Sequence, residues 1–413
     1  MWPKKGNFAA VNYFKRLFSC LSVGLLCWVM LLSSCHHDDP AEPRVRHSRQ
    51  TILIYVAAEN TLGSFFRSDS LEIAQALTTL PDTVQVALFV DNTAGSNLYY
   101  GSSKHELMRI KAYGRNVCST DSAEMEMVLT DVFQYLPAEH YGLIFWSHAS
   151  GWVPQSNKAP RRRTFGIDNG KRSSADDSGP QMEITTMANV LAHHPHTDFI
   201  FFDACFMQCI EVAYQLRHVT DYVLGSPAEI PADGAPYPLV MPYLAAGDVG
   251  GAVRAYHDYY STGAGQKEYG GAIVSTIRTD KLEALARATK PIIADIFAGK
   301  AEVSTSGVQY YYPEAYSGIW TQYFDIVSLF YRYCTAETFD AWRRVFDDAV
   351  PTQCVSDYWA SAASHWPLRV SDPAHCGAVS QYVPLEHYDE WGWNTAYHAY
   401  DWYVDAGMST TNW

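Results

Sequence analysis

Two apolar segments each end in a side chain that can take part in nucleophilic catalysis. The first, YGLIFWSH (141–148), ends at His148, and the second, DFIFFDAC (198–205), ends at Cys205. A thiolate can attack a carbonyl carbon, and an imidazole beside it can take up the thiol proton and then protonate the leaving amine. The pair therefore predicts the chemistry of a cysteine peptidase, provided that the fold brings the two segments together.

A second cysteine, Cys209, follows Cys205 by four positions, which would place both on one face of a helix. Three roles are open for Cys209: a core residue in the first turns of that helix, a resolving partner for Cys205, or a zinc ligand together with Cys205 and His148. The zinc site lacks a fourth ligand, so the core role is preferred. A helix that begins directly after Cys205 would also favour a thiolate, through its unpaired N–H groups and its dipole.

Two acids lie near the cysteine in the sequence. Asp203 precedes Cys205 by two positions, so both side chains would point the same way from a strand. Asp233 belongs to the segment PAEIPADGAPY (227–237), which follows another apolar run. Either acid could bind a basic substrate side chain. Alternatively, Asp203 pairs with an arginine or solvates a strand end, and Asp233 is an ordinary Asp-Gly turn residue.

The segments that must position these side chains alternate between two patterns. Short apolar runs typical of strands buried on both faces lie at 51–58, 84–91, 141–148, 198–205, 221–226 and 270–277. Helical periodicity lies between them at 69–79, 121–136, 181–193 and 206–218, with Asp121 or Ser122 placed to cap the second of these helices. The alternation predicts an α/β fold with a mostly parallel central sheet covered by helices on both faces. Chemistry in such folds gathers at the carboxyl ends of the strands, where His148 and Cys205 would meet.

The first 34 residues are typical of an export signal. Four basic residues precede an apolar run at 17–32, and the Leu-Ser-Ser-Cys of residues 32–35 resembles a lipobox. We predict cleavage before Cys35 and lipidation of its thiol, followed by a polar linker at 35–49. The alternative is an uncleaved membrane anchor, although the apolar run is shorter than the roughly 20 residues that a spanning helix needs. Both interpretations place the rest of the chain outside the cytoplasm.

The composition excludes several classes of partner and site. Four of the 30 basic residues and none of the 44 acidic residues lie within residues 1–34, so the remaining chain has a net charge of −18. That charge argues against nucleic acid or an anionic membrane surface as a partner, and leaves the lipid as the membrane tether. Six of the nine cysteines lie beyond Cys35 without a CxxC pair, so a dense disulfide framework is not expected, although one or two disulfides remain open.

Several segments resemble the clostripain family of cysteine peptidases, whose fold is the caspase-like α/β/α sandwich. The matching pieces are SHASGW (147–152), FFDACFM (201–207), PAEIPADGAPY (227–237) and CGAVSQYVP (376–384). In order and spacing they span roughly residues 50 to 385, and the joint match of the His and Cys motifs is more specific than either motif read alone.

The resemblance implies a role for each residue of these motifs. Cys205 would be the nucleophile and His148 the base that becomes the general acid. The backbone N–H groups of Ala149 and Cys205 would form the oxyanion hole. Asp203 and Asp233 would line an acidic S1 pocket that selects Arg or Lys.

The chain departs from the family pattern at two positions. Ala149 stands where the family usually has glycine, so a glycine-only backbone angle there would be strained. Ala235 stands where the family often has an aromatic residue, which bears on the assignment of the S1 pocket.

Some family members mature by cutting themselves between the catalytic His and Cys. Here the polar segment 154–180 lies in that interval and carries Arg161, Arg162 and Arg163, which are candidates for self-cleavage. The alternative is a solvated basic loop. The sequence contains no calcium-loop pattern, so no cofactor is predicted and a dependence on calcium stays open.

We therefore predict a lipid-anchored cysteine endopeptidase on the outer membrane or surface of a Gram-negative bacterium, acting on protein or peptide chains. Its core would occupy 50–300, and the aromatic-rich region 301–413 would complete that core or be appended to it. The alternative is a catalytically inactive surface lipoprotein that uses the fold to bind protein or glycan. In that case Trp391 and Trp393 would be candidates to stack on sugars.

Overall fold

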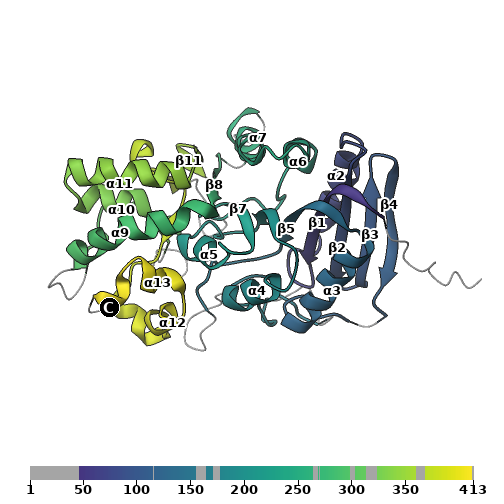
Figure 1. Ribbon diagram of the computed structural model, residues 1–413, viewed down its shortest axis with the longest axis horizontal. Helices are drawn as coiled ribbons and strands as arrows, with labels where there is room; N and C mark the ends of the chain where they lie inside the picture. The colour runs from purple at the N-terminus through teal and green to yellow at the C-terminus, as the bar shows by residue number, and fades with distance from the viewer. Residues whose placement is uncertain are drawn as a thin grey trace, which may run out of the picture. The chain divides into compact units, whose positions relative to one another are not determined.

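A large central sheet organises the molecule. The computed structural model describes residues 46–114, 116–154, 164–170, 177–263, 268, 270–297, 303–312, 323–359 and 368–411. Within them, nine strands form one sheet in the order β10-β8-β7-β6-β5-β1-β2-β3-β4, and helices lie on both of its faces (Figure 1). The predicted α/β/α sandwich with a mostly parallel sheet is confirmed.

The middle of the sheet is parallel and buried on both faces. Its strands are β2 (Val84–Asn92), β1 (Ser48–Ala57), β5 (Ala138–Trp146), β6 (Thr197–Asp203) and β7 (Thr220–Gly225), in that spatial order. Alternate residues of β1 belong to different cores: Leu53 packs on one face of the sheet and Ile54 on the other. Because both faces are covered, these strands are continuous apolar runs.

Two groups of helices cover the faces. One face carries α2 (Phe66–Leu77), α6 (Tyr237–Ala245) and α7 (Val249–Ser261), and the other carries α3 (Ser122–Tyr135), α4 (Ile184–Leu191) and α5 (Ile210–Gln215). The predicted cap of α3 is confirmed, because the Asp121 carboxylate accepts hydrogen bonds from the N–H groups of Ala123 and Glu124.

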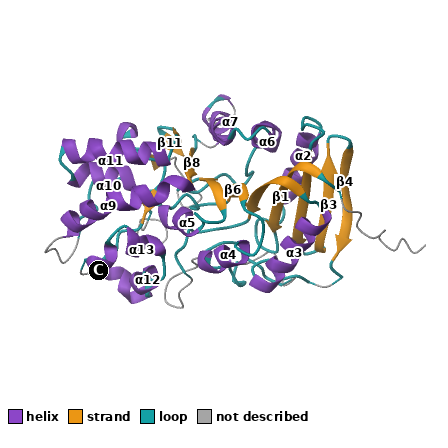
Figure 2. Ribbon diagram, in the orientation of Figure 1, coloured by secondary structure: helices purple, strands orange, loops and turns teal. Residues whose placement is uncertain are grey.

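The two edges of the sheet are antiparallel. At one edge β3 (Gly95–Ser102) and β4 (His105–Ala112) form a hairpin beside β2 (Figure 2), and at the other edge β8 (Ile273–Arg278) and β10 (Thr352–Val355) follow β7. The strand predicted at 270–277 is therefore confirmed, whereas the hairpin was not predicted. Most of β4 is exposed, so its sequence lacks the apolar run that marked the central strands.

The region after residue 300 contributes both to the sheet and to its cover. Its elements are β9 (Phe324–Asp325), α10 (Ile326–Tyr333), α11 (Ala336–Ala349), β10, β11 (Tyr358–Trp359), β12 (Leu368–Arg369), β13 (Ser380–Gln381), α12 (Trp393–Tyr397) and α13 (Asp401–Asp405). It follows α9 (Leu282–Phe297), which packs against α11. The hydroxyl of Tyr214 in α5 donates to Asp405 in α13 at 2.7 Å, so α13 contacts one of the helices that cover the sheet.

Two observations concern a predicted sugar-stacking tryptophan and the presence of membrane-spanning helices. The side chain of Trp393 is fully buried, beside Tyr388 and Trp391, so it is not available to stack on a sugar. In the part of the chain that the structure describes, none of the helices has both the length and the apolar character needed to cross a bilayer.

Candidate active site

The ends of β5 and β6 lie side by side at the carboxyl edge of the sheet. The two strands are parallel, and the last pair in register is Trp146 with Asp203. His148 and Cys205 each lie two residues beyond that pair. Because adjacent strands are about 4.8 Å apart, His148 and Cys205 follow from neighbouring strand ends at one edge of the sheet.

Cys205 lies in a turn and not at the start of a helix. Helix α5 begins only at Ile210, so the prediction of a helix from 206 and of a helix N-terminus directly after Cys205 is wrong. The cause lies at Phe206, whose φ of 62° is incompatible with a right-handed helix and rare for a bulky residue. Its N–H donates to the carbonyl of Ala228 at 3.0 Å, and its ring stacks on Tyr323 at a centroid distance of 4.6 Å. These contacts hold the strained turn that presents Cys205.

The thiol of Cys205 is half-buried and accepts a backbone hydrogen bond. The donor is the N–H of Ile230, 3.4 Å from Sγ. A donor of this kind favours the thiolate over the thiol. The sequence predicts that a helix N-terminus stabilises the thiolate of Cys205. A backbone N–H of the loop after β7 stabilises it instead.

Cys209 is a core residue, as preferred from the sequence. It is fully buried just before α5, its thiol donates to the carbonyl of Phe206 at 2.9 Å, and it accepts from the Ser380 hydroxyl at 3.2 Å. Burial raises the pKa of its thiol well above the usual value, so it is an inert thiol. Across the described residues, no group of three or more His, Cys, Asp or Glu side chains is arranged to hold a metal ion.

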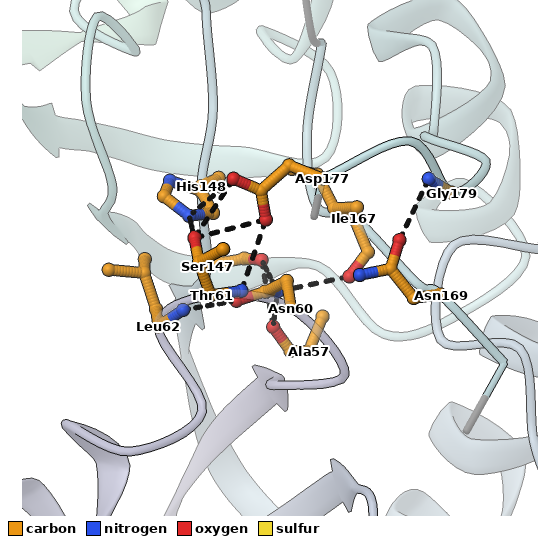
Figure 3. Close-up of polar contacts among 10 residues, drawn as sticks. All are labelled: Ala57, Asn60, Thr61, Leu62, Ser147, His148, Ile167, Asn169, Asp177 and Gly179. Atoms are coloured by element: carbon orange, nitrogen blue, oxygen red, sulfur yellow. Dashed lines mark hydrogen bonds and ion pairs between the residues drawn. The ribbon is translucent and has the colours of Figure 1, made fainter. Parts of the chain in front are cut away.

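The imidazole of His148 is held by the loop that follows β1. Its Nε2 lies 2.8 Å from the hydroxyl oxygen of Thr61 and 3.6 Å from a carboxylate oxygen of Asp177 (Figure 3). Asp177 in turn accepts from the backbone N–H of Thr61 at 3.0 Å and from its hydroxyl at 2.9 Å. The loop is fixed by Asn60, whose amide donates to the carbonyls of Ala57 and Ile167.

This arrangement determines which nitrogen of His148 carries the proton. A hydroxyl has one hydrogen, and the hydroxyl of Thr61 gives its hydrogen to Asp177. The same oxygen can therefore only accept from His148, which requires a proton on Nε2. Nδ1 is left with its lone pair, so it is the nitrogen that can take up a proton from a thiol.

Replacing Thr61 with valine is expected to lower kcat/KM for peptide hydrolysis about tenfold or more, because the imidazole loses the acceptor that fixes its tautomer. Thr61→Ser keeps the hydroxyl and should retain most of the activity. The measurement is the pH profile of kcat/KM for both variants. A purely structural role for Thr61 would leave the profile of the valine variant unshifted, and equal activity in both variants would refute the assignment.

Ala149 stands where the family usually has glycine, but the backbone at this position is not strained. Among the described non-glycine residues with positive φ, only Phe206 and Ala378 appear, so Ala149 has an ordinary conformation. Ala149 forms an isolated antiparallel bridge with Phe165, and the flanking hydrogen bonds are made by the N–H groups of Ser150 and Gly166. The N–H of Ala149 takes no part in those two bonds.

The two predicted specificity acids lie in different environments. Asp203 is buried under the loop that follows β7, and its Oδ2 accepts from the N–H of Ala235 at 3.1 Å and from the hydroxyl of Tyr237 at 2.9 Å. Burial raises the pKa of Asp203 to about 6, partly offset by these two donors. Asp233 is exposed in an Asp-Gly turn, which the N–H of Gly234 closes by donating to the carbonyl of Pro231.

Reasoning from the sequence missed four polar residues of this edge: Thr61, Asp69, Glu72 and Asp177. Asp69 and Glu72 belong to the first turns of α2, and Asp69 is almost fully buried. A buried acid on the apolar face of a predicted helix is a signal that the sequence does contain. Thr61 and Asp177 carried no such signal, since they are 116 positions apart and meet only in the fold. Cys35 and the arginines at 161–163 lie outside the described residues.

Comparisons with known proteins found a matching family model and solved structures of similar fold. A family model described as the clostripain family matches residues 54–355. A secreted C11 cysteine protease from Bacteroides thetaiotaomicron, in complex with an irreversible peptide inhibitor, is 28% identical with a TM-score of 0.73, covering 88% of this chain and 100% of that chain. An inactive zymogen C11 protease from Parabacteroides distasonis is 26% identical with a TM-score of 0.70, covering 87% of this chain and 98% of that chain. No curated protein matches the chain.

Proposed function

The chain belongs to the clostripain family of cysteine endopeptidases, and on that premise we propose that it cleaves peptide bonds after Arg or Lys with Cys205 as nucleophile and His148 as base and acid. The observation that carries the proposal is the register of β5 and β6. It pairs Trp146 with Asp203, which supports a dyad formed by the two residues that follow this pair by two positions, His148 and Cys205.

The reaction follows from the groups at this edge. Nδ1 of His148 takes up the thiol proton, and the thiolate of Cys205 attacks the carbonyl carbon of the substrate. The backbone N–H groups of Ala149 and Cys205 stabilise the oxyanion. The imidazolium then protonates the leaving amine as the C–N bond breaks, and water hydrolyses the thioester with His148 again acting as base. The carboxylate of Asp177, 3.6 Å from Nε2, favours the imidazolium that forms between these steps.

The preference for a basic P1 residue rests on the acids beside the nucleophile. Asp203 lies two residues before Cys205, and among the described residues its hydrogen-bond donors are the neutral Ala235 and Tyr237. Asp233 would add negative charge at the exposed rim. A cation that enters this site supplies the missing countercharge, whereas a neutral side chain leaves the acid unpaired.

We place the enzyme outside the cytoplasm, attached to the outer membrane through a lipid on Cys35. The lipobox-like residues 32–35 and the basic, apolar start of the chain support this placement. The similar protease from Bacteroides thetaiotaomicron is described as secreted, and its structure holds a peptide inhibitor, which supports peptide chains as the substrates of this enzyme.

Self-cleavage in the segment between His148 and Cys205 is expected to convert the single chain into two fragments. Replacing Arg161, Arg162 and Arg163 together with alanine should leave one chain, because the cleaved bonds would follow those residues. Gel electrophoresis and sequencing of the new N-terminus measure the outcome. Fragments that persist in the triple variant, or that arise in Cys205→Ala alone, would exclude this route of maturation.

The test of the proposed function is a panel of peptides with Arg, Lys or neutral P1 residues. The chain from residue 36 onward is incubated with each peptide under reducing conditions, with and without calcium, beside its Cys205→Ala variant. Cleavage confined to basic P1 residues and absent from the variant supports the proposal. No turnover of any peptide by the wild type would leave the binding role, without catalysis, as the better account.

A further inference from the structure

One tyrosine contacts both of the loops that follow the reactive strand ends. Tyr323 directly precedes β9, and its side chain is 2% exposed. Its hydroxyl donates to the carbonyl of Ser150 at 2.5 Å, two residues beyond His148. Its ring stacks on Phe206, the residue after Cys205, at a centroid distance of 4.6 Å and an interplanar angle of 14°. A side chain from the region after residue 300 thus bridges the loop after β5 and the loop after β6.

The tyrosine and the two loops are closely packed at Gly151. The φ of Gly151 is 65°, a conformation that favours glycine. A Cβ at this position would lie 2.8 Å from Sγ of Cys209 and 3.1 Å from the carbonyl oxygen of Phe206. It would also lie 3.3 Å from the ring of Tyr323. The loop after β5 therefore packs directly on the loop after β6, with the tyrosine ring beside both.

The backbone on both sides of Tyr323 is held in place, so its ring has a defined position. The carbonyl of Tyr323 accepts from the N–H of Tyr311 at 3.0 Å, and β9, which follows it, pairs with β13. The first residue of β13, Ser380, donates its N–H to the carbonyl of Gln208 in the loop after β6 at 3.0 Å. The segment that carries the tyrosine is therefore hydrogen-bonded to one of the loops that its side chain contacts.

The loop after β5 has a second anchor that does not involve Tyr323. Trp152 is fully buried and stacks on Tyr397 at a centroid distance of 5.2 Å. The carbonyl of Trp152 accepts from the hydroxyl of Tyr400 at 3.3 Å. Loss of the Tyr323 hydroxyl is therefore not expected to detach the loop. It would remove one restraint, the orientation of the Ser150 carbonyl.

The residues that Tyr323 contacts come directly after the two proposed oxyanion donors. Ser150 follows Ala149, and Phe206 follows Cys205. An oxyanion hole stabilises the transition state when both N–H groups point at the position that the oxygen will occupy, at about 2.7–3.1 Å. A rotation of the backbone beside either donor changes the direction of its N–H. The alignment of the two donors therefore depends on what holds the residues that follow them.

We propose that Tyr323 is a positioning residue that fixes the two oxyanion donors relative to each other. The inference rests on the proposed peptidase function. Tyr323 acts through its neighbours, with the hydroxyl on Ser150 and the ring on Phe206. Because one rigid side chain holds both loops, loss of either contact lets one donor move relative to the other. The barrier to the tetrahedral intermediate then rises, while binding of the peptide changes less.

The test measures kcat and KM of the full-length protein in detergent, with the peptide that the wild type cleaves fastest. Active sites are counted by the extent of alkylation of Cys205. Tyr323→Phe keeps the ring and removes the hydroxyl, and it should lower kcat per active site about tenfold with KM changed less than about threefold. Tyr323→Leu also removes the ring stack and should lower kcat about 10²-fold.

Tyr311→Phe is the matched control for these variants. Tyr311 is a fully buried tyrosine whose backbone pairs with that of Tyr323. Its hydroxyl donates to Asp325 at 2.6 Å, which belongs to β9 and to neither of the two loops. This variant loses a buried hydroxyl of the same kind and should keep kcat per active site within about twofold of the wild type. A loss equal to that of Tyr323→Phe would overturn the inference.

The rate of alkylation of Cys205 by iodoacetamide separates the oxyanion donors from the nucleophile. In that reaction the thiolate forms a bond to carbon and displaces iodide, so it needs the thiolate but develops no oxyanion. The alkylation rate and its pH profile should therefore be the same in both Tyr323 variants as in the wild type, although kcat is lower. A parallel fall in the alkylation rate would show that Tyr323 acts on the thiolate and would contradict the proposed role.

The outcomes also separate this inference from the proposed function. An unchanged kcat per active site in both Tyr323 variants would assign the tyrosine to packing alone, and would leave the proposed function standing. A wild type that turns over no peptide overturns both. If Tyr323→Leu does not fold, Tyr323→Phe decides the matter, because it keeps the ring and its contact with Phe206.

Discussion

Replacing Cys205 with alanine is expected to abolish peptide hydrolysis, with a loss of about 10⁴-fold or more in kcat, because the proposed covalent intermediate forms on this thiol. The neighbouring thiol cannot substitute for it: Cys209 is fully buried, and the pKa of its thiol is raised well above the usual value. His148→Ala should cost about 10²- to 10⁴-fold through loss of the proton acceptor and donor. Single-turnover assays with an activated ester and with a peptide separate these roles, since a good leaving group needs less help from the imidazole.

The control for these variants is another cysteine of similar exposure. Cys354 lies on the edge strand β10 and is half-buried, and burial raises the pKa of its thiol to about 11. Cys354→Ala should keep full activity and stability. Turnover that survives in Cys205→Ala, or that disappears in Cys354→Ala, would show that the nucleophile has been assigned to the wrong residue.

The second large effect is expected at Asp203. Asp203→Asn should lower kcat/KM for peptides with Arg or Lys at P1 by about 10³-fold or more, and should leave cleavage after neutral residues within a few-fold of the wild type. The amide keeps an oxygen that can accept from Ala235 and Tyr237, so the loop retains its anchor while the negative charge is lost. An equal loss for basic and neutral substrates would instead indicate a collapse of the loop over the nucleophile.

The same residue predicts a pH dependence. Because burial raises the pKa of Asp203 from the usual 3.8 to about 6, its carboxyl group is neutral below that pH and cannot pair with a cation. The kcat/KM for peptides with Arg or Lys at P1 is therefore expected to fall as the pH drops below about 6, whereas kcat/KM for peptides with a neutral P1 residue changes less. The decisive quantity is the ratio of kcat/KM for basic to neutral peptides across pH 5 to 8, since a pH effect on the chemical step affects both classes alike.

Much of the sheet could be predicted because its strands are buried on both faces. Runs such as 51–58 and 84–91 contain little but apolar residues, and each is a central strand with a core on either side. The hairpin at 95–112 escaped prediction because burial, which made the other runs apolar, is largely absent from β4. Local pattern thus identified the strands that the tertiary structure encloses and missed those at the edge.

The turn after Cys205 shows the opposite case, in which a local pattern misled. Residues 206–218 have helical periodicity, but the helix begins only at Ile210. Phe206 takes a left-handed conformation because Tyr323 and Ala228, both distant in the sequence, hold its ring and its N–H. Contacts of this kind override helical propensity, and nothing within a window of a few residues reveals them.

The types and spacing of His148, Asp203 and Cys205 suggested a cysteine peptidase, because a strand end, a period of two and the chemistry of a thiol are local properties, and the resemblance to the clostripain family gave these residues their proposed roles. Their surroundings were not predictable in this way. Thr61 and Asp177, which contact the imidazole, come from segments far apart in the chain. Local sequence proposes the reacting groups, whereas the protonation, charge and reach of a site depend on neighbours that only folding brings within a few ångströms.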